Sequence, residues 1–124
     1  MKIHESAENY LETILVLGFG GAGVHSVEVA AELGVTKPSV SVAMKNLREG
    51  GYITMDGELH ITLTDTGREI AERMYERHVF LTTWLKTLGV PEETAARDAC
   101  RMEHVISAES FAAIKEFAKN IPAR

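Results

Sequence analysis

The spacing of apolar residues near the start of the chain predicts a helix. Leu11, Ile14 and Leu15 fall on one face, in a segment that runs from a Ser6 cap to about Leu17. Acidic and amide side chains occupy the opposite edge at helical intervals, namely Glu5, Glu8, Asn9 and Glu12. This edge is either a solvated acidic face or a source of oxygen ligands.

A glycine-rich stretch follows at residues 18–23 and matches the spacing GxGxxG. In a dinucleotide fold this motif follows a strand and opens a βαβ unit. Here the apolar run before it continues a helical stripe, and no alternation of strands and helices comes after it. We therefore interpret the stretch as a flexible connector, and a hydride-transfer enzyme is the lowest-ranked function.

Two short helices joined through a glycine turn come next, which is the helix-turn-helix pattern. Ser26 is expected to cap the first, over residues 27–33, and Gly34 to end it. Thr36 is expected to cap the second, which buries Val40, Met44 and Leu47. The short hydroxyl groups and cations of this second helix suit base edges and phosphates. The expected DNA contacts are Thr36, Lys37, Pro38, Ser39, Ser41, Lys45 and Arg48.

A β-hairpin is predicted directly after this helix. Residues 52–55 and 58–63 read as strands, and Asp56-Gly57 favours a two-residue type I′ turn between them. Leu59, Ile61 and Leu63 alternate and should face the core. A hairpin directly after the recognition helix is a wing, so the pattern predicts a winged helix-turn-helix. The alternative is that the same fold serves only for protein contacts.

Three helices are predicted in the rest of the chain. The first runs from Thr64 or Asp65 to about Leu88, the second starts at Pro91, and Ser107 caps the third. The inward positions expected are Ile70, Met74, Leu81, Leu85 and Leu88 in the first helix and Phe111, Ile114 and Phe117 in the last. Phe80 and Trp84 add apolar bulk, and helix-turn-helix proteins commonly read palindromes as dimers, so we expect a homodimer through these helices.

One short motif carries candidate metal chemistry. Cys100, Glu103 and His104 stand at i, i+3 and i+4, so a helix places a thiolate, a carboxylate and an imidazole on one face. These groups would form half of a transition-metal site. A charged stripe on a solvated helix gives the same spacing. His78 lies on the apolar stripe of the long helix, where a lone histidine is commonly a hydrogen-bonded core residue.

Composition narrows the class of protein. A chain of 124 residues makes one domain or two small ones sharing a core. Cys100 is the only cysteine, no run of about eighteen apolar residues exists, and residues 1–5 lack the apolar core of a signal peptide. We expect a cytoplasmic location and no membrane contact. The formal net charge of −5 disfavours indiscriminate nucleic-acid binding, but residues 36–48 carry three cations and no acid.

Four separated motifs together resemble the DtxR/MntR family of metal-dependent transcriptional repressors. They are residues 6–12, the helix start at residues 37–41, the Glu76-Arg77-His78 triplet and residues 100–105. The likeness covers essentially the whole chain and keeps the order and spacing of the motifs. It implies a mostly α-helical fold, with a winged helix-turn-helix domain at residues 1–71 and a helical metal-binding and dimerisation domain at residues 72–124. The SH3-like domain of some iron regulators is not expected.

The resemblance also implies the metal ligands, which are Asn9, Glu12, His78, Cys100, Glu103 and His104. Asn9 stands where manganese regulators carry aspartate and iron regulators methionine; it binds through its carbonyl oxygen or hydrogen-bonds to a ligand. Cys100 matches the iron regulators, whereas Glu12 matches the manganese branch. A thiolate with imidazoles favours Fe(II), Zn(II) or Co(II), and carboxylates suit Fe(II) and Mn(II), so we expect Fe(II) first and Mn(II) next.

The function expected from the sequence is repression of metal-homeostasis genes, with the divalent ion as corepressor. The ion orients a homodimer on palindromic double-stranded operator DNA, and we expect neither an organic cofactor nor catalytic activity. One alternative is a metal-independent winged-helix repressor. Another is a small metal hydrolase, which lacks an evident general base and leaves the helix-turn-helix unexplained.

Overall fold

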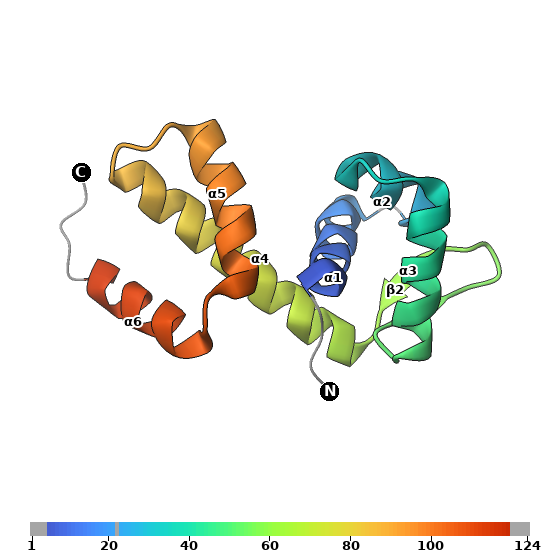
Figure 1. Cartoon of the computed structure of the whole chain (residues 1–124). Coiled ribbons are helices and arrows are strands. Elements are labelled where there is room, and N and C mark those ends of the chain that lie inside the picture. Colours follow the sequence, from blue (N-terminus) through green and yellow to red (C-terminus); the bar gives the residue numbers. More distant parts are fainter. Residues whose placement is uncertain (1–4, 22, 120–124) are drawn as a thin grey trace. The chain divides into compact units, whose positions relative to one another are not determined.

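The computed structural model describes residues 5–21 and 23–119. The chain divides into two compact units, Met1–Arg73 and Met74–Arg124, each described below by itself. Figure 1 follows the elements in order of sequence. They are α1 (Glu5–Leu17), the 3-10 helix η1 (Gly18–Gly20), α2 (Ser26–Leu33), α3 (Lys37–Glu49), β1 (Ile53–Met55), β2 (Ile61–Leu63), α4 (Asp65–Thr87), α5 (Glu92–Val105) and α6 (Ala108–Lys119).

The first unit is a winged helix-turn-helix, as the sequence predicts. Its helices α1, α2 and α3 bury one apolar side each, and the inner faces of β1 and β2 complete the core (Figure 1). The buried side chains of this core include Leu11, Val29, Val40, Met44, Leu47 and Ile53. Burial of this kind stabilises by roughly 25 cal/mol for each Å² of apolar surface removed from water.

The helix boundaries follow local capping, with two corrections to the sequence prediction. The Thr36 side chain accepts a hydrogen bond from the Ser39 amide at 3.3 Å, so the expected cap of α3 is confirmed. The expected Ser26 cap is wrong, because the N-cap residue of α2 is His25, whose amide donates to the Glu28 carboxylate at 3.0 Å. Ser6 is not a cap either, because α1 already includes Glu5.

The wing, residues 53–63, pairs β1 with β2 in antiparallel register, with Ile53 opposite Leu63 and Met55 opposite Ile61. Five residues therefore separate the strands, and the predicted two-residue turn is wrong. The Asp56 carboxylate accepts bonds from the amides of Glu58 and His60 at 2.8 and 2.9 Å, which closes the longer loop instead.

The structure of the first unit also tests the predictions made for Leu59 and for the glycine-rich stretch. Leu59 was expected to face the core, but it adopts a φ of 64° and is 62% exposed. The glycine-rich connector contains the 3-10 helix η1, and the segment before it is helical rather than a strand. A dinucleotide fingerprint would require that strand.

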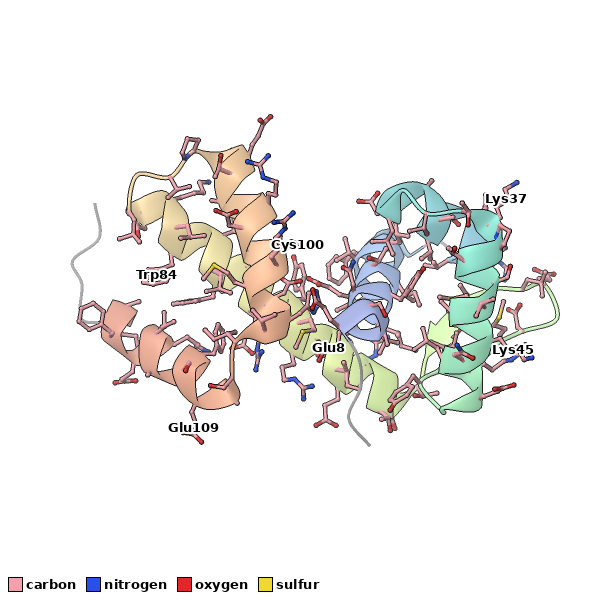
Figure 2. All side chains as sticks on the ribbon, viewed as in Figure 1. Glu8, Lys37, Lys45, Trp84, Cys100 and Glu109 are labelled. Carbon is pink, nitrogen blue, oxygen red and sulfur yellow. The ribbon has the colours of Figure 1, made fainter. Side chains whose placement is uncertain are left out.

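The second unit packs α5 and α6 against the C-terminal part of α4. Leu81, Ala99 and Phe111 are buried at its centre, with the rings of Phe80 and Trp84 against them. Phe80 and Phe111 meet edge to face, with centroids 5.5 Å apart. Figure 2 shows the Trp84 side chain within this group of helices.

Two residues expected to be buried in this unit are exposed. Leu88 is 56% exposed because it follows the end of α4, where Gly89 (φ 96°) turns the backbone away from the helical period. Phe117 is 65% exposed, since burial decreases along α6 from Phe111 and the packing covers only the first turns of that helix. In the described part of the chain, no helix combines the length and apolarity that a membrane span needs.

Candidate functional site

A buried carboxylate in the second unit is the centre of the candidate metal site. Glu103 on α5 is fully buried. Its Oε2 lies 2.9 Å from His78 Nδ1 on α4, and its Oε1 lies 3.3 Å from His104 Nε2. The His104 side chain is 3% exposed, and that of His78 is 30% exposed. The structure therefore brings together three of the residues that the sequence proposes as ligands.

The sequence places this carboxylate in the core through the period of α5. Ala95, Ala99 and Glu103 are spaced four residues apart and are all buried, so Glu103 continues a stripe of small core residues. A buried charge is costly unless other charges or hydrogen bonds compensate for it. The alanines allow α5 to lie close to its neighbours, which explains how Glu103 on α5 reaches His78 on α4.

Each imidazole faces a different oxygen atom of the Glu103 carboxylate. The 2.9 Å separation is that of a hydrogen bond between His78 and Glu103, and the 3.3 Å separation is that of an ion pair between His104 and Glu103. Carboxylate and imidazole together suit Fe(II), Mn(II), Co(II) and Zn(II).

Cys100 lies on the same face of α5, one turn before Glu103 and His104. Its side chain is half-buried, and its position is labelled in Figure 2. It is the one soft donor that α5 offers on this face. Its proximity along the helix keeps it a candidate fourth ligand.

The two remaining proposed ligands belong to the first unit. Asn9 and Glu12 are one turn apart on α1, with Asn9 half-buried and Glu12 buried. The Asn9 backbone carbonyl accepts the Thr13 hydroxyl at 2.8 Å. Their role as ligands remains a prediction of the sequence.

Arg77 supports the candidate site and was not predicted from the sequence. It is 7% exposed, and its Nη1 donates to the backbone carbonyls of Glu103 and Ile106, each at 2.9 Å. Its guanidinium also lies over the Phe111 ring, 5.4 Å from the centroid. Carbonyl groups at a helix C-terminus lack intrahelical partners, so Arg77 closes α5 just where Glu103 and His104 are placed. Its spacing could have indicated burial, since Arg77 falls between Met74 and Leu81 on the buried stripe of α4.

The candidate DNA-contacting face lies on α3 in the first unit. Every residue expected there is exposed: Thr36, Lys37, Pro38, Ser39, Ser41, Lys45 and Arg48. Figure 2 shows Lys37 and Lys45 extending from α3 away from the core of their unit. The opposite side of the helix buries Val40, Met44 and Leu47, so the packed core holds this charged face outward.

Comparison with protein families matches both parts of the chain. The model of the iron-dependent repressor N-terminal DNA-binding domain matches residues 2–61. The model of the iron-dependent repressor metal-binding and dimerisation domain matches residues 64–122.

Individual relatives give the same result. The transcriptional regulator MntR of Salmonella typhimurium is 37% identical over 115 residues, covering 91% of this chain and 72% of that protein. The iron-dependent repressor IdeR of Mycobacterium bovis is 31% identical over 104 residues, covering 83% of this chain and 45% of that protein. A solved manganese-dependent transcriptional repressor in complex with manganese matches with a TM-score of 0.84 and 30% identity. The match covers 91% of this chain and 52% of that one, so the chain spans about half the length of that structure.

Proposed function

The chain belongs to the family of metal-dependent transcriptional repressors, and we propose that it binds its operator DNA when a divalent ion is held at Glu103. The observation that carries this proposal is the buried Glu103 carboxylate between the imidazoles of His78 and His104. A carboxylate buried in a protein core is costly unless a nearby cation compensates for its charge.

The proposed ligands are His78, Cys100, Glu103 and His104 from the second unit and Glu12 from the first. Asn9 lies one turn from Glu12 and either adds its carbonyl oxygen or hydrogen-bonds to a ligand. A bound ion supplies the positive charge that the carboxylates require at close range. In return, Glu12 and the ligands of α4 and α5 hold the two units in one orientation.

We propose Fe(II) as the resident ion and Mn(II) as the next candidate. The relatives include the regulator MntR at 37% identity, an iron-dependent repressor at 31% and a manganese-dependent repressor at 30%, so similarity does not assign the ion. The proposed donor set supports this order, because a thiolate beside two imidazoles favours Fe(II) over Mn(II), and the carboxylates suit both ions.

Repression then follows from the placement of two copies of α3. A homodimer through the second unit reads a palindromic operator when its two recognition helices are about 34–36 Å apart, one turn of DNA. Ligands drawn from both units couple that spacing to ion binding. A coupling of about 1–3 kcal/mol, or roughly 5–150-fold in operator affinity, is typical of such linkage. Because the proposed partner is operator DNA, we also propose a cytoplasmic location.

The test is a DNA-binding titration in air-free buffer. Operator duplexes are selected from a random pool with ion-loaded protein, and their affinity for chelated protein is then measured as Fe(II), Mn(II), Zn(II) or Co(II) is added. We expect tighter binding with ion, with the largest gain for Fe(II). Equal affinity with and without every ion would remove the proposal, and a larger gain with Mn(II) would reverse the order of ions.

A matched pair of variants tests the site itself. Glu103→Gln keeps the shape of the side chain and removes its charge, so we expect the ion-dependent gain to disappear. Glu93→Gln removes an exposed carboxylate from the same helix and should behave as wild type.

A further inference from the structure

Two histidines of the first unit oppose each other at the base of the wing. Val24 forms an antiparallel bridge with Ile61, and the Ile61 amide donates to the Val24 carbonyl at 2.8 Å. Because paired antiparallel segments advance in opposite directions, the next opposed residues are His25 and His60. Val24 and Ile61 are buried, so the two histidines share the outer face. Their rings lie with centroids 4.4 Å apart at an angle of 47°.

Each imidazole is oriented by its own carboxylate. His60 Nδ1 lies 3.1 Å from Asp56 Oδ2, and His25 Nδ1 lies 3.4 Å from Glu28 Oε1. A carboxylate at Nδ1 keeps the ring proton on that atom and leaves the Nε2 lone pair available. The same arrangement, a histidine backed by a carboxylate, recurs behind metal-ligating histidines.

A glycine makes room for one of the two rings. A Cβ atom added at Gly23 would lie 2.7 Å from His60 Nε2 and closer still to Cδ2 of that ring. The close approach of the His60 ring therefore leaves no room for a side chain at this position. The last glycine of the GxGxxG stretch therefore has a specific packing role.

We propose that His25 and His60 form a second metal site, at the base of the wing, for an imidazole-preferring divalent ion such as Zn(II). Two imidazoles without a protein carboxylate at Nε2 select late first-row ions, whose affinity for nitrogen ligands exceeds that of Mn(II). Since His25 begins α2 and His60 ends the wing loop, an ion shared by both joins the wing to the helix-turn-helix. This site is separate from the ligands around Glu103 and does not depend on the proposed corepressor.

The test follows individual imidazoles in the full chain. The protein is labelled with ¹⁵N in its histidines, and the Nε2 resonances are recorded as Zn(II) is raised to excess. We expect His25 and His60 to shift together with a common Zn(II) dependence, in addition to any response of His78 and His104. Mn(II) at equal concentration should act on His25 and His60 far more weakly.

Variants separate a shared site from two independent rings. His25→Gln should abolish the shift of His60 at low Zn(II). Gly23→Ala and Asp56→Asn, which keep both imidazoles, should each weaken Zn(II) binding there about tenfold or more. Glu32→Gln, which removes an exposed acid of α2, is the control.

Two outcomes overturn the proposal. One is that His25 and His60 stay unshifted while His78 and His104 respond. The other is that the His60 response survives in His25→Gln. A protein in which only His25 and His60 respond would instead contradict the proposed corepressor site and leave this one standing.

Discussion

Replacing Arg77 by methionine tests how the proposed metal ligands are held. The substitution keeps most of the apolar length of the side chain and removes the guanidinium, which donates to two backbone carbonyls at 2.9 Å. A hydrogen bond to a charged group contributes about 1.5–3 kcal/mol, and a buried acceptor left unsatisfied costs about 1–3 kcal/mol. The bond to Glu103 is buried and the bond to Ile106 only partly so, which reduces the contribution of the second. We therefore expect the free energy of unfolding to fall by about 2–4 kcal/mol.

The expected change in melting temperature follows from the size of the chain. For 124 residues, each kcal/mol corresponds to about 3–5 °C, so the midpoint should fall by about 6–20 °C. The substitution should also affect the proposed metal site, because Arg77 holds the end of α5 that carries Glu103. Supporting contacts of this kind typically change metal affinity about 10–100-fold.

The assay is urea unfolding of chelated protein followed by tryptophan fluorescence. Trp84 is the only tryptophan and lies in the same core as Arg77, so its emission reports on the second unit. Affinity for Mn(II) and Co(II) is measured in parallel, with the Co(II) absorption spectrum as a readout of ligand geometry. Arg77→Lys, which restores one charged donor, should recover part of the stability and of the spectrum.

The control removes an exposed arginine of α5, the helix whose end Arg77 contacts. Arg101→Met should unfold as wild type does. If Arg77→Met were as stable as Arg101→Met and bound Co(II) with an unchanged spectrum, the reasoning about a clamped α5 would be refuted.

Three further predictions concern the first unit. Lys37→Ala should weaken binding to all duplex sequences and reduce the slope of log affinity against log salt by about 1, measured by fluorescence anisotropy over a salt series; an unchanged slope would mean that Lys37 meets no phosphate. Gly67→Ala should lower the free energy of unfolding by about 1–3 kcal/mol, because the new Cβ would lie 3.0 Å from the Tyr52 carbonyl carbon and closer to its oxygen. The control, Gly57→Ala, places its Cβ in open space and should be near neutral in the same urea experiment. The pKa of Asp56 should lie below its usual range, because backbone amides of the wing loop donate to its carboxylate. That contribution to stability is present above the pKa of the unfolded state and is lost as pH falls through the folded value; a ¹³C titration of the carboxyl group showing an ordinary pKa would contradict it.

Helix positions and most caps could be predicted from the sequence, because they depend on neighbouring residues. Thr64 and Ser107 accept the amides of Gly67 and Ser110, as capping residues should. The prediction failed where side chains a few residues apart offered competing bonds. Glu28 made His25 the cap instead of Ser26, and Asp56 replaced the two-residue turn with a longer loop.

The candidate metal site could be predicted only in part. The i, i+3, i+4 spacing on α5 identified Cys100, Glu103 and His104 from local geometry alone. His78 entered through the resemblance, since the 25 residues that separate it from Glu103 leave no local signal. Arg77 was missed because an arginine at a core position is unfavourable until its partners are known.

The sequence by itself determined the order of helices, the helix-turn-helix and the kinds of donor atoms available, since periodicity and capping act over a few residues. Only the tertiary structure decided which charges are buried and which imidazoles face which carboxylates. Those outcomes depend on how helices distant in sequence pack together, and a charged group becomes tolerable in a core only when that packing supplies its partners.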